Sequence, residues 1–274
     1  MDTLILIMIR DKIKDKSYFE SFLHKLEDID KKTEEKISSG NVNPERIIPV
    51  RMSMINSLIR RMKAKYSLGL PIHTMLDEYN EALNLIEENW SGNNKFVGNN
   101  NEVLDQYSLG NYDSILWMLS IGYLLDVSED GFKILVNAID EDNVKDKLFE
   151  FIISAKIPLR PKIESESYKY GWELYGKLRK AIEADDKSKA SNLVKTFLEK
   201  DWYKEHKNSG WYNSHVNRHD TYSGYWSFES AAVVKIMGLD DSGFIDNPYY
   251  PKDLVHQSPE PHKKKSFLGK LGFK

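Results

Sequence analysis

The chain of 274 residues contains no cysteine. Disulfide bonds, thiolate metal sites and a cysteine nucleophile are therefore excluded. Long hydrophobic runs are missing as well, because the apolar stretch at residues 4–9 has only six residues, whereas a membrane-spanning helix needs about 20. This stretch also lacks the basic flank and the small-residue cleavage site of a secretory signal. We interpret it as the buried start of a first helix, and we expect a cytoplasmic protein.

Sequence motifs of common enzymes are absent too. The chain contains neither of the phosphate-binding patterns G-x-G-x-x-G and G-x-x-x-x-G-K-[ST], and it lacks the nucleophile elbow G-x-S-x-G. Hydrophobic residues make up 41% of the chain and charged residues 30%, which is typical of a globular protein. We therefore expect a folded protein that is not an enzyme and that uses neither a cofactor nor a metal ion.

Helical periodicity is the main signal in what remains. Phe132, Leu135, Val136 and Ile139 lie at i, i+3, i+4 and i+7, on one face of a helix, and Ser128 is a suitable N-cap for it. Period-2 patterns typical of strands are scarce. We therefore predict an all-α fold of many helices. The expected helices lie near residues 5–38, 44–66, 72–90, 110–125, 129–140, 143–156, 166–183, 187–201 and 225–237.

Two stretches interrupt the helical pattern. The polar stretch 91–101 predicts a loop. Residues 157–161, with the sequence IPLRP, predict an extended link, because each proline removes a donor and restricts the residue before it. We therefore divide the chain into two helical parts that pack together, residues 1–157 and 158–257. A basic tail, residues 258–274, follows them.

Charge is unevenly distributed, although the net charge is only −3. Residues 77–150 contain 16 acids and 4 bases, for a net charge of −12. Residues 151–274 contain 16 acids and 21 bases. An acidic block of this kind indicates either a solvated surface or a surface for a basic partner, and charge alone does not separate the two.

Two patterns offer alternative functions. His215 and His219, spaced i, i+4, would hold zinc if they lay on a helix, and with Asp220 they would support a metal-dependent hydrolase. Val216 stands where a metalloprotease has its glutamate, however, and no helical pattern covers the pair. Hydrogen-bonding histidines in a loop are the simpler interpretation. The basic tail, with its scattered apolar residues, would instead suit a membrane-peripheral helical scaffold.

Aromatic residues gather in the C-terminal part. They are Trp202, Tyr203, Trp211, Tyr212, Tyr222, Tyr225, Trp226 and Phe228. Aromatics interleaved with bases stack on single-stranded nucleic acid, but only three bases accompany this group. We therefore favour a packed aromatic scaffold and expect no direct contact with nucleic acid. Glu229, Asp240 and Asp241 offer carboxylates for an acid–base pair, although backbone hydrogen bonding is the simpler role for the two aspartates.

The C-terminal sequence YSGYWSFESAAVVKIMGLDDS (residues 222–242), followed by NPYYPKDL (residues 247–254), resembles the PoNi family of immunity proteins, the partners of PoNe polymorphic DNase toxins. The C-terminal motif is long and unlike common patterns. The resemblance extends over nearly the whole chain, up to about residue 256. Shorter pieces that carry it are IRD (9–11), YF (18–19), KYSLG (65–69), LWMLS (116–120), PLRP (158–161), WY (202–203) and WYNSH (211–215).

This resemblance implies an all-helical protein that binds and neutralises a cognate toxin, a DNase, and so protects the producing bacterium. Because a DNase cleft is basic, we expect carboxylates of the acidic block to steer and contact the toxin. The candidate toxin-binding residues are Asp77, Glu78, Glu81, Glu87, Glu88, Asp126, Glu129, Asp130, Asp140, Glu141, Asp142 and Asp146. The family motif is expected to maintain the fold through Tyr225, Trp226, Phe228, Glu229, Asp240, Asp241, Tyr249, Tyr250, Pro251 and Asp253.

Overall fold

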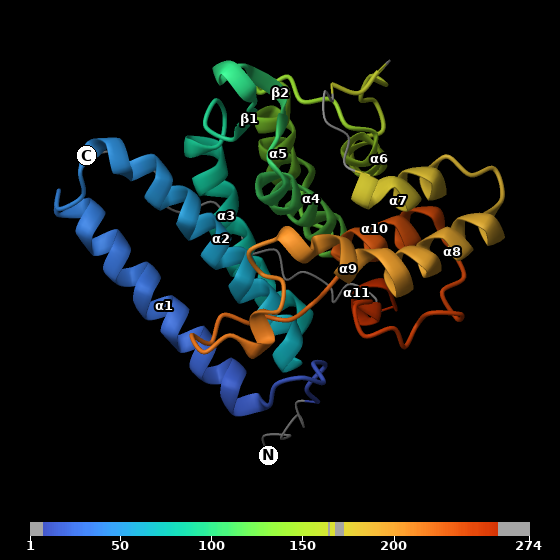
Figure 1. Ribbon diagram of the computed structural model, residues 1–274, viewed down its shortest axis with the longest axis horizontal. Coiled ribbons are helices and arrows are strands. Elements are labelled where there is room, and N and C mark those ends of the chain that lie inside the picture. The colour runs from blue at the N-terminus through green and yellow to red at the C-terminus, as the bar shows by residue number, and fades with distance from the viewer. Residues whose placement is uncertain (1–7, 164, 168–172, 257–274) are drawn as a thin grey trace, which may run out of the picture.

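The computed structural model describes residues 8–163, 165–167 and 173–256. Within these ranges the chain is mostly helical, with one short antiparallel pair of strands, and the predicted all-α class is confirmed (Figure 1). The helices are α1 (Lys16–Ser38), α2 (Pro44–Leu68), α3 (Leu76–Asn89), α4 (Leu109–Leu124), α5 (Glu129–Glu141), α6 (Lys147–Lys156), α7 (Gly176–Ile182), α8 (Lys187–Thr196), α9 (Trp202–Glu205), α10 (Phe228–Met237) and α11 (Lys252–His256). The strands are β1 (Lys95–Val97) and β2 (Val103–Tyr107).

Capping side chains fix several helix ends at the positions that the sequence indicates. The Ser128 hydroxyl accepts a hydrogen bond from the Gly131 backbone N–H (3.2 Å) at the start of α5. Asn43 accepts one from the Glu45 N–H (3.1 Å) at the start of α2. The C-cap of α2 is Gly69, whose φ of 88° is left-handed and suits glycine. Each N-cap stabilises its helix by about 1 kcal/mol.

Helix α4 lies at the centre of the molecule. Its residues 112–122 are all buried, because α2, α5, α6 and α10 surround it. A helix that is apolar on all sides is expected in such a position. Gly122 leaves room for the Tyr79 side chain of α3, since a Cβ atom there would lie 2.1 Å from the Tyr79 hydroxyl. The main core is therefore built around one central helix rather than between two separate layers.

A segment of the C-terminal part, residues 209–227, returns to the N-terminal helices; we call it the crossover segment. Figure 1 shows it in orange, running from α9 toward α1 and α2. The Tyr18 hydroxyl donates to the Tyr222 carbonyl (2.9 Å), and the Ser67 hydroxyl donates to the Ser223 carbonyl (3.0 Å). The crossover segment therefore adds non-covalent contacts between the two parts of the chain that residues 157–161 connect covalently.

The predicted first helix is wrong at its start. Residues 1–7 lie outside the described residues, and residues 8–15 are not helical. The Asp11 carboxylate accepts hydrogen bonds from the backbone N–H groups of Ile13 (2.7 Å) and Lys14 (2.8 Å), which folds this stretch into a turn. Met8, expected to be buried, is 79% exposed. No helix in the described part of the chain has the length and apolar character needed to cross a membrane.

Two other stretches also differ from the prediction. The expected loop at residues 91–101 contains β1, which pairs with β2. The expected helix 166–183 is reduced to α7 and a preceding 3₁₀ turn, Glu173–Tyr175, with residues 168–172 outside the described residues. Instead of starting a helix, Ser167 donates its backbone N–H to the Lys145 carbonyl (3.0 Å) and accepts the Lys145 N–H with its hydroxyl (2.9 Å).

Candidate functional site

One of the candidate acids, Glu78, is buried inside the helical core. It lies on α3 and is 2% exposed. Its two carboxylate oxygens bind Arg61 (2.9 Å) and Lys65 (2.5 Å) of α2. Glu78 therefore joins two helices and is not available to a partner in this structure.

Asp142 and Asp146 are also buried, each 1% exposed. Asp142 accepts hydrogen bonds from the Gly92 N–H (2.7 Å) and the Tyr107 hydroxyl (2.8 Å). Asp146 caps α6 and binds Arg179 of α7 in an ion pair. Burial raises the pKa of both carboxyl groups, and these partners oppose that effect. The expected surface role therefore does not fit Glu78, Asp142 or Asp146, because their side chains are used inside the protein.

The remaining candidates around α5 are exposed, but most have a basic neighbour. They are Asp126, Glu129, Asp130, Asp140 and Glu141. Lys156 binds the first of these (2.5 Å), and Lys133 lies within 2.9 and 3.6 Å of the next two. Two guanidinium nitrogens of Arg160 donate hydrogen bonds to Asp140 (2.6 and 2.9 Å). The local bases therefore reduce the negative potential at this end of the molecule.

The exposed candidates on α3 lie beside a groove that α1, α2 and α3 form together, with a volume of about 720 Å³. They are Asp77, Glu81, Glu87 and Glu88. The acids that line the groove are Glu27, Asp30, Glu34, Glu35, Glu81 and Glu88. Only three bases share the lining, namely Lys31, Arg51 and Arg61. We call this feature the acidic groove.

The electrostatics of the acidic groove reflect this excess of carboxylates. Partial burial raises the pKa of Glu81, and the nearby acids Asp30, Glu78 and Glu34 add to the effect, whereas Arg61 opposes it. Burial also raises the pKa of Asp30, although the Ser57 hydroxyl donates a hydrogen bond to it (2.8 Å). Acids crowded in this way favour a partner that brings positive charge.

The distribution of charge along the sequence did not reveal the acids that α1 contributes to the groove. Helix α1 mixes acids and bases in sequence, so no acidic block stands out there. Glu27, Asp30 and Glu34 are nevertheless spaced i, i+3, i+7 and share one helix face. This helical spacing is the signal that would have identified them.

The histidines of the alternative hydrolase do not form a helical pair. His215 lies in a short 3₁₀ turn, Ser214–Val216, and His219 lies beyond its end. His215 Nδ1 contacts the Tyr225 hydroxyl (2.8 Å), and His219 Nε2 accepts a hydrogen bond from Arg218 (3.0 Å). Among the described residues, no group of three His, Asp or Glu side chains is placed to hold a metal ion. The basic tail of the other alternative lies outside the described residues.

The aromatic cluster is packed into the protein. Trp202, Tyr222 and Phe228 are almost completely buried, and the other rings stack or tilt against one another. Trp202 and Trp211, for example, stack with their centroids 5.3 Å apart. Five of the eight rings are buried and the other three are half-buried, so the cluster fits a scaffold better than a surface for stacking bases.

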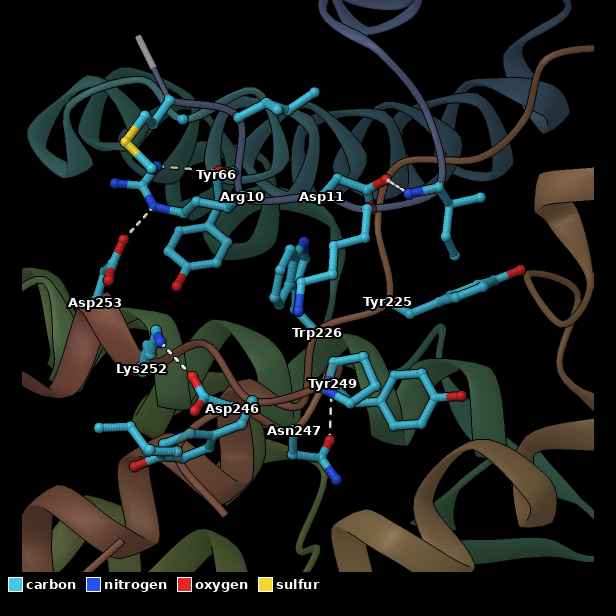
Figure 2. A pocket seen from close by; sticks show the side chains of 18 of the residues that line it. Arg10, Asp11, Tyr66, Tyr225, Trp226, Asp246, Asn247, Tyr249, Lys252 and Asp253 are labelled. Carbon is cyan, nitrogen blue, oxygen red and sulfur yellow. Dashed lines mark hydrogen bonds and ion pairs between the residues drawn. The ribbon is translucent and has the colours of Figure 1, made fainter. Parts of the chain in front are cut away.

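The C-terminal motif meets the N-terminal residues around a pocket of about 500 Å³ (Figure 2). Arg10 reaches across it to Asp253 (2.5 Å) and donates to the Tyr66 carbonyl (3.1 Å). The Trp226 ring meets the Tyr66 ring edge-on, with centroids 4.8 Å apart. Figure 2 shows these side chains pointing toward one another from separate elements, so this region joins the two ends of the described chain.

The other residues of the motif occupy similar structural positions. Phe228, Glu229, Tyr250 and Pro251 are buried, and Tyr249 is half-buried in the aromatic cluster. Asp241 accepts a hydrogen bond from the Tyr250 hydroxyl (2.8 Å). Asp240 is exposed and accepts one from the Ser242 backbone N–H (2.9 Å), as the expected turn requires. Glu229 accepts a hydrogen bond from the Trp202 indole N–H (2.5 Å), so all three of these carboxylates serve local hydrogen bonds.

Comparison with known proteins places the chain in a family. Residues 10–137 match the family model of the PoNe immunity protein (PoNi), N-terminal, and residues 144–254 match that of the PoNe immunity proteins (PoNi), C-terminal. The crystal structure of protein PA2201 from Pseudomonas aeruginosa has a similar fold, with a TM-score of 0.62, 15% identity, and coverage of 91% of this chain and 90% of that one. A comparison with curated proteins finds no match. The chain therefore belongs to the PoNi family of PoNe immunity proteins.

Proposed function

We propose that this protein binds a cognate PoNe toxin with DNase activity in the cytoplasm of the producing cell and blocks it without catalysing a reaction. Membership of the PoNi family supports a toxin partner. The acidic groove supports the kind of partner, because a DNase binds a polyanion and therefore carries a basic cleft. The toxin's cleft, or its rim, faces the carboxylates of this groove.

The acidic groove is a better contact surface than the α5 acids. In the groove, Arg51 and Arg61 pair with Glu34, Glu27 and Asp30, and the other three acids make no ion pair among the described residues, namely Glu35, Glu81 and Glu88. Of the five exposed acids around α5, only Glu141 makes none there, because Lys133, Lys156 and Arg160 bind the others. Acids without local compensation attract a basic protein more strongly and over a longer range. Asp77 and Glu87 are exposed on the same helix, α3, but do not line the groove.

Paired charge reversals test this surface. We expect Glu81→Lys/Glu88→Lys to slow association with the toxin at least about tenfold at physiological salt, because steering depends on charge complementarity. The difference should shrink at high salt. Association is measured by stopped-flow mixing with the purified toxin, and protection by survival of cells that express both proteins.

A matched control separates this surface from the general charge of the protein. Asp130→Lys/Glu141→Lys makes the same charge change on the exposed face of α5 and should leave association nearly unchanged. Equal slowing by both variants would show that only the net charge of the protein matters. Slowing by the control alone would indicate that the toxin contacts α5 instead of the groove. Full protection and unchanged rates in the groove variant would refute the proposal.

A further inference from the structure

Four ionisable side chains meet in the interior where the N-terminal and C-terminal helices join. Lys63 of α2 and Asp113 of α4 come from one side, and His206 and Glu229 come from the other. Each is at most 2% exposed. Charged groups are seldom this deeply buried unless they are paired, so the arrangement needs a physical explanation.

The hydrogen bonds around His206 determine its protonation. Nδ1 lies 2.5 Å from the Trp202 carbonyl oxygen, which can only accept. Nε2 lies 3.2 Å from the Tyr175 hydroxyl, and that hydroxyl donates its single proton to Asp113 Oδ1 (2.6 Å). Nε2 must therefore donate to the hydroxyl oxygen of Tyr175. Both ring nitrogens are donors, and a histidine with two donors is an imidazolium.

Asp113 supplies the counter-charge across the junction. Its Oδ2 lies 3.5 Å from His206 Nε2 and has no hydrogen-bond partner among the described residues. Burial opposes a charge on the ring, but the nearby Asp113 carboxylate and the hydrogen bond to the Trp202 carbonyl outweigh it, so the pKa of His206 is raised from its ordinary value of 6.5. The geometry of the contacts and the raised pKa both indicate a protonated ring.

His206 also supports the crossover segment. Its ring lies 4.7 Å from the ring of Trp211, which belongs to that segment. Trp211 in turn faces Trp117 of α4 (6.1 Å between centroids), and Lys63 Nζ lies over both indoles, 4.0 Å from Trp117 and 5.2 Å from Trp211. The packing of the crossover segment against α2 and α4 therefore continues directly from the His206–Asp113 pair.

We propose that His206 is held as an imidazolium that locks the crossover segment onto α2 and α4, and that loss of its proton releases this lock. A neutral ring has one N–H, so either the Tyr175 hydroxyl or the Trp202 carbonyl loses its donor, and Asp113 loses its cation. The other ionisable groups that face the ring are Glu229 from α10 and Tyr175 from the 3₁₀ turn before α7. Lys63 from α2 belongs to the same cluster through its interactions with Asp113 and Glu229.

The direction of the pH effect follows from linkage. Because the pKa of His206 is higher in the folded protein than in the unfolded chain, its contribution to stability is complete below pH 6.5. That contribution is lost as the pH rises through the folded pKa. The junction is therefore tightest at mildly acidic pH and loosens toward alkaline pH.

Nitrogen-15 NMR of the full chain, labelled at histidine, tests the protonation directly. We expect His206 to be mainly imidazolium at pH 6.5, with both ring nitrogens protonated and a titration midpoint above 6.5. His206→Gln identifies the signal by its loss, and His219→Gln, which removes an exposed ring from the crossover segment, leaves it in place. A mainly neutral ring at pH 6.5 would overturn the proposal.

Hydrogen exchange of the backbone amides tests the release. After correction for intrinsic exchange rates, protection of residues 209–227 should fall across the His206 titration, while protection in α4 changes less. Asp113→Asn should lower the titration midpoint of His206 and reduce this protection already at pH 6.5. If Asp113→Asn does not fold, the NMR titration and the hydrogen exchange of the wild type still test the proposal. Protection of residues 209–227 that stays constant across the His206 titration would refute the lock.

Discussion

Glu78 and Glu81 lie one turn apart on α3 but have opposite surroundings. Glu78 is buried between Arg61 and Lys65, whereas Glu81 is exposed at the acidic groove. We expect Glu78→Gln to lower the free energy of unfolding by about 2 to 4 kcal/mol, because two cations lose their shared anion in a mostly buried place. Urea unfolding followed by circular dichroism measures this change.

Glu81→Gln is the matched control for that substitution. It removes the same charge from the same helix at an exposed position, so its effect on stability should stay within about 0.5 kcal/mol. Equal unfolding midpoints for the two variants would show that Glu78 is not a structural ion-pair residue. In the folded fraction, only the Glu81 variant is expected to change toxin association.

At this scale, charge counting along the sequence identified an acidic region but not the role of each acid. Glu78 shares a helix face with Ala82 and Leu85, both buried, and this i, i+4, i+7 spacing marks it as an inward residue. The burial of Asp142 and Asp146 depends on Tyr107 and Arg179, which come from distant parts of the chain. No local pattern could have revealed those partners.

Among the elements, the link at residues 157–161 is tied to α5 and α6 by the Arg160 side chain. Arg160 binds Asp140 of α5 and Glu150 of α6, each through two hydrogen bonds of 2.6 to 2.9 Å. We expect Arg160→Gln to destabilise the fold by about 1 to 3 kcal/mol, because charge-assisted contacts to both helices are lost. Thermal unfolding measures the loss.

Two further variants give this prediction a reference. Arg160→Lys keeps the charge but not the planar fork, so it should fall between the wild type and Arg160→Gln. Lys162→Gln, at an exposed position two residues later, should leave the melting temperature unchanged. A melting temperature of Arg160→Gln equal to that of Lys162→Gln would mean that the link is not held by this arginine.

Helix prediction succeeded where periodicity and a cap agreed. Helix α5 was expected at 129–140 and spans Glu129–Glu141, because its apolar stripe and the Ser128 cap specify the same element. The first helix was placed too early, since the apolar residues 4–9 suggested a helical start while Asp11 makes a turn. The two short strands, β1 inside the asparagine-rich stretch and β2 just after it, were missed because three to five residues give no periodic signal.

At the level of the whole molecule, the division into two helical parts stays a prediction of the sequence. The prolines at residues 158 and 161 indicate a link, and they are informative because proline acts locally. The crossover segment is different, since Tyr222 reaches Tyr18 over more than 200 positions of the chain. Such long-range pairing depends on the folded core, and only the family motif hinted that this stretch was special.

The buried charges at the junction make the stability of the whole protein depend on pH. Burial lowers the pKa of Lys63 from 10.5 to about 8, and only part of this effect is offset by Asp113 and Glu229. Between these two pH values the unfolded chain binds more protons than the folded protein, so the contribution of Lys63 to the free energy of unfolding rises with pH. Below pH 8 the buried ammonium is a full cost.

The size of this contribution follows from the difference between the pKa values of Lys63 in the unfolded and the folded protein. A pKa difference of this size corresponds to about 3 kcal/mol over the whole titration, and somewhat less than this falls between pH 8 and pH 10.5, because each titration also extends beyond its own midpoint. We therefore expect the stability of the wild type, relative to Lys63→Met, to rise by about 2 kcal/mol from pH 8 toward pH 10.5. Urea unfolding of both proteins at pH 7, 8, 9 and 10 measures the difference, and Lys63→Leu repeats it with another apolar side chain. Loss of the His206 proton alters the stability of both proteins alike, so its effect largely cancels in the comparison. Parallel curves of stability against pH between pH 8 and 10 would show that Lys63 is not a buried cation at neutral pH.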